Sequence, residues 1–312
     1  MHVPERKSAD ERNVPRTITP LAIPVYNRTS ALKFPLSATE LERQVRDALE
    51  EDRAFNDITS IATVVSDRRA RAMFVARDAG TLAGIALAIE AFRLMDTKVA
   101  IRVDRDDGWR VAAGEPVFHV TGHARGILAA ERVALNFAQK LSGIATLTAR
   151  FVDIVQGTGA LIMDTRKTTP GWRVLEKYAV RAGGGINHRM DLSDGVLIKD
   201  NHLAACDGDV KLAVKRAREM APAGIEIEVE CEVPAQVQAA VEAGAHIALL
   251  DNMSLDAMRE SVAIAKGKIL TEASGGVTPS TVRAIAETGV NRISVGMLTH
   301  SPPALNLALD FA

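Results

Sequence analysis

The spacing of apolar residues divides the chain into two predicted parts. The first part contains short apolar runs separated by glycines, and other segments in which apolar residues recur at helical spacing. This mixture is typical of an α+β domain with clustered strands. Ser37 and Glu40 form a capping-box pattern, so a helix is expected to begin there. A helical hairpin is expected from Leu128 to Val155, broken near Ser142. The predicted strands are Ala70–Ala76, Thr81–Leu87, Val99–Val103 and Pro116–Val120.

From Gly159 onward, apolar runs alternate with amphipathic stretches, and this βαβα pattern predicts a parallel sheet. No G-x-G-x-x-G motif follows a first strand, and residues of functional types stand at the C-terminal end of every run. Both facts favour an α/β barrel, complete or incomplete, over a doubly wound sheet. The predicted strands are Ala160–Met163, Gly195–Ile198, Ile225–Val229, His246–Leu250, Lys268–Thr271 and Arg292–Val295. The predicted helices are Asp209–Met220, Pro234–Ala243, Leu255–Ala265 and Pro279–Thr288.

Composition narrows the functional classes. The chain has 312 residues with 38 Lys and Arg against 39 Asp and Glu, so its net charge of -1 argues against nucleic acid or a membrane as partner. Two cysteines exclude a disulfide scaffold. Residues 1–35 carry five prolines and no signal-peptide pattern, which predicts a mobile extension and a cytoplasmic protein. Because the overall charge is balanced, any anion site must be built locally.

The predicted strand ends carry the candidate chemistry. In a barrel all of these ends face one mouth, so their side chains are expected to lie together. The cations there suit carboxylates or phosphates, and the two carboxylates suit Mg²⁺ or sugar hydroxyls. Ser274-Gly275-Gly276 precedes Thr278 and Pro279, an expected helix start that suits a phosphate. The cations are Arg166, Lys167, His188, Arg189 and Lys199, and the carboxylates are Glu230 and Asp251.

Taken singly, these features also have structural interpretations. Arg166 and Lys167 are compatible with solvated loop charges, and Glu230 and Asp251 with structural partners of the cations. Gly183–Gly185 is compatible with a flexible loop. The set is stronger than its members, because independent strands all end in compatible residues. Together they indicate a phosphorylated sugar bound beside a small anion, with Mg²⁺.

Several motifs together resemble quinolinate phosphoribosyltransferase, also called carboxylating nicotinate-nucleotide pyrophosphorylase. The resemblance runs in order from about residue 37 to the C-terminus. It is carried by Glu131–Asn136, Leu141–Thr146, Asp164–Gly171, Lys177–Val180, Gly183–Arg189, Leu197–His202, Glu228–Glu230, Leu250–Asn252, Glu272–Gly276 and Val295–Thr299.

The resemblance implies an N-terminal α+β sandwich domain over residues 36–135, to which residues 303–312 return. An incomplete α/β barrel of parallel strands over residues 136–302 would carry the active site. The family forms homodimers in which the N-terminal domain of one subunit covers the barrel mouth of the other. The implied reaction joins quinolinate to phosphoribosyl pyrophosphate and releases pyrophosphate and CO₂, giving nicotinate mononucleotide for NAD biosynthesis.

The resemblance also implies a role for each site residue. Lys167, Lys199, Glu230 and Asp251 would be catalytic, and Glu230 and Asp251 would also contact Mg²⁺, directly or through water or substrate. Quinolinate would be bound by Arg132 of the second subunit and by Thr165, Arg166, His188, Arg189 and Lys199. The phosphoribosyl group would be bound by Lys167, Glu230, Asp251, Ser274, Gly275, Gly276, Val295, Gly296 and Met297.

Three alternatives stay open at this point. One is a phosphoribosyltransferase of the same fold that acts on another acid, or a related protein of molybdate-uptake operons. The second is a Schiff-base barrel enzyme using Lys199 or Lys167. The third is a non-catalytic binding protein, which would be expected to lose one or more of the cations that this chain keeps.

Overall fold

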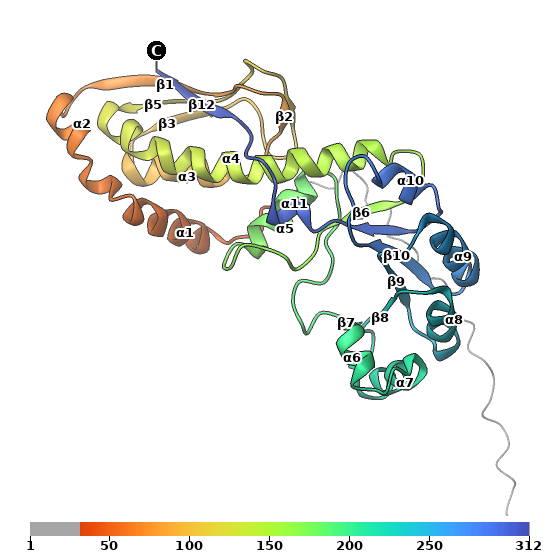
Figure 1. The fold of residues 1–312 in the computed structure, drawn as a ribbon. Coiled ribbons are helices and arrows are strands. Elements are labelled where there is room, and N and C mark those ends of the chain that lie inside the picture. Colours follow the sequence, from red (N-terminus) through yellow and green to blue (C-terminus); the bar gives the residue numbers. More distant parts are fainter. Residues whose placement is uncertain (1–31, 312) are drawn as a thin grey trace, which may run out of the picture.

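One long helix joins two parts of the molecule, a mainly antiparallel part and a parallel one (Figure 1). The structure, a computed structural model, describes residues 32–311. The extension predicted over residues 1–35 therefore lies almost wholly outside the described residues. The first part contains α1 (Ala38–Glu51), η1 (Ala54–Asn56), α2 (Ile58–Thr63), β1 (Arg69–Ala76), β2 (Gly80–Thr81), α3 (Ile85–Met95), β3 (Ala100–Val103), β4 (Arg110–Val111) and β5 (Pro116–His123).

The long helix and the elements after it complete the chain. They are α4 (Ala124–Ile154), β6 (Leu161–Met163), α5 (Arg173–Ala182), β7 (Val196–Ile198), α6 (Asp200–Ala204), α7 (Val210–Met220), β8 (Ile227–Cys231), α8 (Pro234–Ala243), β9 (Ile247–Asp251), α9 (Leu255–Ala265), β10 (Leu270–Ser274), α10 (Val282–Ala286), β11 (Arg292–Ser294), α11 (Met297–His300) and β12 (Leu307–Phe311). The predicted capping box opens α1, where Ser37 and Glu40 cap each other.

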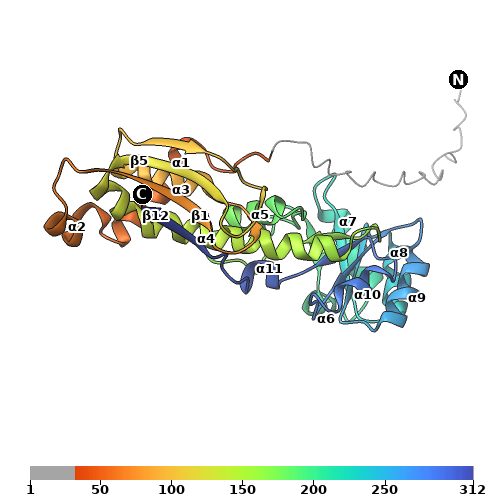
Figure 2. The same cartoon turned by 90° about the horizontal axis from the view of Figure 1, so that it is seen from above.

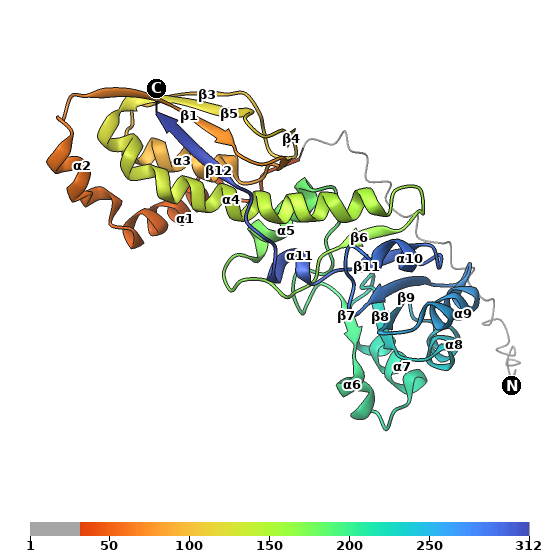
Figure 3. The same ribbon diagram turned by 45° about the horizontal axis from the view of Figure 1, so that its top comes forward.

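The first part is an antiparallel sheet in the order β12-β1-β5-β3, with α3 and α4 beneath it (Figure 3). Its core includes the stacked rings of Phe74 and Phe118, whose centroids lie 4.6 Å apart. The strand β12 comes from the other end of the described chain and pairs with β1 from Ala72↔Phe311 to Ala76↔Leu307. Figure 2 shows the C-terminus lying beside this sheet, far from the parallel strands. The expected return of the chain to the first part is thus visible as a strand.

The second part is a six-stranded parallel sheet in the order β6-β11-β10-β9-β8-β7. Within residues 32–311 no ladder closes it between β6 and β7, and only the bridge Met163↔Ile186 extends beyond β6. The predicted mixture of an α+β sandwich and an incomplete barrel of parallel strands is therefore confirmed. All six strands run parallel, so their carboxyl ends meet at one mouth.

The predicted helical hairpin is wrong, because α4 runs unbroken through Ser142 and Gly143. Ser142 Oγ accepts from the Ala83 amide at 3.0 Å and donates to its carbonyl at 3.2 Å. Gly143 lets another chain segment approach, since a Cβ there would lie 2.1 Å from Pro303 O. The Ser-Gly pair is a contact point of a straight helix rather than a turn.

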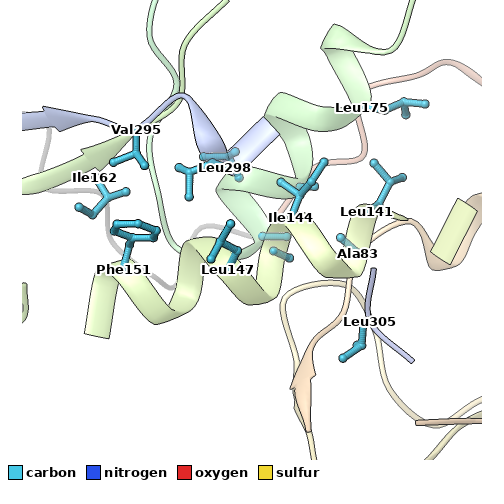
Figure 4. Close-up of a cluster of buried hydrophobic side chains, with 14 of the residues drawn as sticks. Ala83, Leu141, Ile144, Leu147, Phe151, Ile162, Leu175, Val295, Leu298 and Leu305 are labelled. Carbon is cyan, nitrogen blue, oxygen red and sulfur yellow. The ribbon is translucent and has the colours of Figure 1, made fainter. Parts of the chain in front are cut away.

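The middle of α4 belongs to the cores of both parts (Figure 4). Leu141 faces Ala83 and Leu305, while Phe151 lies beside Ile162 and Val295 of the barrel. The boundary expected near residue 135 therefore falls inside one rigid helix. A second correction concerns Thr81–Leu87, predicted as a strand: only Gly80–Thr81 is extended, and α3 begins at Ile85 after a left-handed Gly84.

Candidate active site

A cavity of about 710 Å³ opens at the carboxyl ends of the parallel strands. Every predicted site residue except Arg132 lines it. Residues at the carboxyl ends of all six strands, or in the loops that follow them, contribute, so the expectation that strand ends converge on one mouth holds for this set. The predicted residues in its wall are Thr165, Arg166, Lys167, His188, Arg189, Lys199, Glu230, Asp251, Ser274, Gly275, Gly276, Val295, Gly296 and Met297.

Hydrogen bonds and an ion pair to neighbouring residues hold two of the cations in place. Lys199 follows β7, and its Nζ lies 2.6 Å from Glu230 Oε2. Arg189 donates to the Gly195 carbonyl at 2.9 Å. Burial, together with the nearby charge of Arg166, lowers the pKa of Arg189. Partly buried guanidinium groups of like charge side by side gain from an anion between them, so this wall is suited to a carboxylate or phosphate.

The two carboxylates end neighbouring strands. Glu230 lies on β8 opposite Leu249, and Asp251 is the last residue of β9, opposite Ser274. Asn252 donates its side-chain amide to Asp251 Oδ2 at 2.7 Å, which fixes that carboxylate. Carboxylate oxygens are the ligands that Mg²⁺ prefers, and it commonly binds through one or two of them with water and substrate phosphates.

Glycines open the mouth at two points. Gly275 has φ +94, and a Cβ there would lie 2.1 Å from Asn252 Oδ1. Gly296 leaves room for the side chain of Lys167, whose Cδ would lie 3.2 Å from a Cβ. The helix expected to start at Pro279 instead begins at Val282 and is only five residues long, because Thr278 and Thr281 form a hydrogen-bonded turn before it.

The glycine loop at Gly183–Gly185 is not part of the cavity wall. A Cβ at Gly183 would lie 2.4 Å from Ala145 O, and one at Gly185 would lie 2.8 Å from Thr148 Cγ2. The loop packs tightly against α4, so it is neither a flexible loop nor a ligand-binding one. Glycine is required there because two backbone segments touch.

Below the mouth lies a buried network that the sequence analysis did not assign. Lys177 on α5 donates to Asp164 and, at 2.9 Å, to the His188 carbonyl. Asp164 also accepts from the His188 amide at 2.9 Å and from the Asn187 side chain. Burial raises the pKa of Asp164 and lowers that of Lys177, in each case against the pull of its partner. The signal in the sequence was Lys177, a charged residue on the apolar face of a helix.

His188 lines the cavity, but both ring nitrogens have protein neighbours. Nδ1 accepts from the Arg189 amide at 2.8 Å. Nε2 lies 3.1 Å from Glu228 Oε2 and 3.5 Å from Glu272 Oε1. Both glutamates fall within the family-like motifs but had no predicted role. The structure places both inside strands, Glu228 on β8 and Glu272 on β10.

Arg132 is an exposed residue of α4 and does not line the cavity. Its expected contribution from a second subunit stays a prediction. Among residues 32–311, no helix is both long and apolar enough to cross a bilayer.

In this incomplete barrel the strand ends surround one cavity with cations, two carboxylates and glycine turns. Such a site is typical of the class of proteins that bind phosphorylated, polyanionic small molecules. Comparison with family models is more specific. The quinolinate phosphoribosyl transferase N-terminal domain matches residues 57–142, and the C-terminal domain of the same family matches residues 144–310. The chain belongs to the quinolinate phosphoribosyl transferase family.

Individual relatives agree. The probable carboxylating nicotinate-nucleotide pyrophosphorylase of Bacillus subtilis is 43% identical, covering 87% of this chain and 93% of its own. The Mycobacterium leprae enzyme of that name is 42% identical, covering 85% and 95%. The Streptococcus pyogenes NadC structure has a TM-score of 0.84 at 38% identity, covering 89% and 99%. The Francisella tularensis nicotinate-nucleotide pyrophosphorylase has a TM-score of 0.83 at 37%, covering 90% and 99%.

Proposed function

We propose that this chain transfers the phosphoribosyl group of phosphoribosyl pyrophosphate to quinolinate with loss of CO₂. The products are nicotinate mononucleotide and pyrophosphate, an entry into NAD biosynthesis. One observation carries the proposal: residues predicted from six separate strand ends line a single cavity in a chain whose relatives carry this enzyme's name. A smaller monocarboxylic acid would not need so many cations.

In this proposal the cations grip the two carboxylates of quinolinate. Arg166, Arg189 and Lys199 lie in the same wall, and a guanidinium can bind a carboxylate through two parallel hydrogen bonds. Holding the acid at both carboxylates aims its ring nitrogen at the ribose carbon. Such positioning replaces a bimolecular encounter with a fixed geometry.

Lys167 and the strand-end carboxylates act on the phosphoribosyl side. As pyrophosphate departs, negative charge grows on it and positive charge grows on the ribose carbon. Lys167 stabilises the first, and Glu230 and Asp251 stabilise the second while accepting from ribose hydroxyls. The ring nitrogen then becomes a pyridinium, which stabilises the electron pair left on the adjacent ring carbon when its carboxylate departs as CO₂. That carbon then takes up a proton from water, and a C–H bond replaces the C–C bond that was lost. No covalent bond to the protein is needed.

Mg²⁺ fits this site as a proposed cofactor. Glu230 and Asp251 offer oxygen ligands from adjacent strands, and neither carboxylate is fully buried. When bound, the ion would offset the charge of pyrophosphate. Glu230 is also 2.6 Å from Lys199, so it orients that lysine whether or not it touches the ion.

We further propose a homodimer in which Arg132 of one subunit completes the quinolinate site of the other. Its exposure on α4 and its absence from the cavity of its own subunit support this arrangement. A cytoplasmic location is likewise proposed only from the sequence. Relatives from rice and tobacco are named as chloroplastic and mitochondrial.

The test mixes the protein with quinolinate, phosphoribosyl pyrophosphate and Mg²⁺ and follows quinolinate loss and CO₂ release. Equal amounts of both are expected, with no comparable turnover of nicotinate. Lys199→Ala should lose activity by orders of magnitude, whereas Lys215→Ala, a lysine exposed on α7, should not. Absence of reaction under all conditions refutes the function, and a borohydride-trapped adduct would favour a Schiff-base enzyme instead.

A further inference from the structure

Both polar groups of the Lys167 backbone are held by threonine hydroxyls. The Lys167 N–H donates to Thr165 Oγ1 at 3.1 Å. The Lys167 carbonyl accepts from Thr299 Oγ1 at 2.8 Å. Thr165 belongs to the same loop, between β6 and α5, whereas Thr299 lies on α11 and is 132 residues away in the sequence. Thr299 therefore connects the loop that carries Lys167 to a distant element of the fold.

Thr299 is a fixed donor, because it lies in the core. The residue is fully buried, and its hydroxyl is 3.4 Å from the Gly296 carbonyl, so the shorter contact with Lys167 is its main hydrogen bond. Val295 and Leu298 of the same segment are buried as well and pack beside α4 (Figure 4). A donor held in a packed core fixes the position of its acceptor, since a buried hydroxyl left unpaired is costly.

The side chain of Lys167 meets the same segment. A Cβ added at Gly296 would lie 3.2 Å from Lys167 Cδ, so the stem of the lysine crosses the turn that leads into α11. Lys167 and Gly296 both line the candidate active-site cavity, whereas Thr299 does not. Thr299 can therefore influence a bound substrate only through its neighbours, and Lys167 is the closer of the two residues that accept its hydroxyl proton.

The position of the Lys167 ammonium group matters most in the transition state. In the proposed reaction this group stabilises the negative charge that grows on departing pyrophosphate. An interaction that strengthens only in the transition state affects kcat rather than substrate binding. A lysine side chain is long and flexible, and a misplacement of about 1 Å at a catalytic group can cost about 10²-fold in rate. Contacts at the carbonyl and at the stem of Lys167 restrict this freedom.

We propose that Thr299 is a positioning residue, which directs Lys167 toward the departing pyrophosphate through its hydrogen bond to the Lys167 carbonyl. Because β6 and β11 are neighbouring strands of the sheet, the segments that follow them lie side by side and can be joined in this way. Thr299 touches no substrate, and the position requires its hydroxyl rather than its size. The proposal rests on the proposed function and deepens it on the phosphoribosyl side.

The first test separates the hydroxyl from the shape of the side chain, since valine lacks the donor and serine keeps it. In Thr299→Val, kcat should fall about 10- to 100-fold with little change in the KM for quinolinate, whereas Thr299→Ser should stay within about threefold of the unmodified protein. Thr148→Val is the matched control and should keep its kcat, because Thr148 is equally buried and donates at 2.8 Å to a carbonyl inside α4. Unchanged kcat in Thr299→Val, or an equal loss in Thr299→Ser, overturns the proposal.

The second test shows whether Thr299 acts through Lys167. Without the lysine side chain the hydrogen bond has no ammonium group to position, so Lys167→Ala with and without Thr299→Val should have the same kcat, measured as CO₂ release over hours. An added loss in the double variant as large as that in Thr299→Val alone would show a purely structural role and overturn the proposal. No turnover of quinolinate by the unmodified protein refutes the proposed function itself, whereas turnover that Thr299→Val leaves unchanged refutes only the role of Thr299.

Discussion

Replacing Asp164 with Asn breaks the buried ion pair that supports the site. Lys177 is 1% exposed and Asp164 is fully buried, so the lysine would keep its charge with no carboxylate to offset it. The new amide nitrogen would face either the Asn187 amide nitrogen or the N–H groups of Lys177 and His188, so donors that now meet a carboxylate oxygen would lose their acceptor. The sequence neighbours Thr165, Arg166 and Lys167 would lose the anchor of their loop.

The expected cost follows from the burial of the pair. Removing one partner of a buried ion pair typically costs about 3 to 5 kcal/mol, because the other charge is left unpaired. The pKa directions agree, since burial outweighs the partner at both Asp164 and Lys177. Removing both charges is often nearly neutral, so the double variant Asp164→Asn with Lys177→Met should be more stable than Asp164→Asn alone.

Urea unfolding followed by circular dichroism gives these differences directly. Asp153→Asn is the matched control, because the Arg110–Asp153 pair is about half exposed on both sides. Such surface pairs contribute about 0 to 1 kcal/mol. A cost for Asp164→Asn no larger than for Asp153→Asn, or no recovery in the double variant, would refute the reasoning.

Four other residues lead to predictions of their own. Arg132→Ala should lower turnover by orders of magnitude without changing the urea midpoint of unfolding. Equal activity in Arg132→Ala and in the unmodified protein would show that Arg132 is not part of the site. Gly143→Ala should destabilise by about 1 to 3 kcal/mol despite better helix propensity, since its Cβ would meet Pro303 O; an increased urea midpoint would contradict this. Gly275→Ala should weaken binding of phosphoribosyl pyrophosphate in calorimetry, because φ is +94 and Asn252 fills the space that a Cβ would need; unchanged affinity would count against phosphate binding at Ser274–Gly276. Glu272 binds its proton more tightly in the folded protein, with a pKa of about 8 against 4.5. Its contribution to the free energy of unfolding is therefore fully present below about pH 4.5 and is lost as the pH rises through about 8. Between these values Glu272→Gln should reduce the fall in the free energy of unfolding by about 1.4 kcal/mol per pH unit, and parallel stability curves for the two proteins would contradict this.

The parallel part was largely predictable because two signals in the amino-acid sequence indicate most of its strands. An apolar run marks the strand, and a polar residue marks its carboxyl end, so Glu230 and Asp251 could be assigned to one mouth from the amino-acid sequence alone. The helices α8 and α9 begin and end at the predicted residues, since Pro234 and Ser254 mark their starts. Barrel geometry then converts these local signals into proximity.

The errors share a different cause. Ser142 and Gly143 look like a helix break, yet they sit where Ala83 and Pro303 approach α4 from distant parts of the chain. Local composition cannot distinguish a turn from a close contact. The same applies to Glu272, whose meaning depends on neighbours from β8, β11 and the loop carrying His188.

The pairing of β12 with β1 has a consequence for synthesis on the ribosome. Arg77 and Asp310, which form an ion pair beside these strands, are 233 residues apart. At a translation rate of about 5 to 20 residues per second, β12 is synthesised roughly 10 to 50 s after β1. Throughout that time one edge of β1, which carries Phe74 and Val75, is an open template for another nascent chain. The edge of β1 that β12 covers is therefore the part of this sheet that stays unpaired longest during translation.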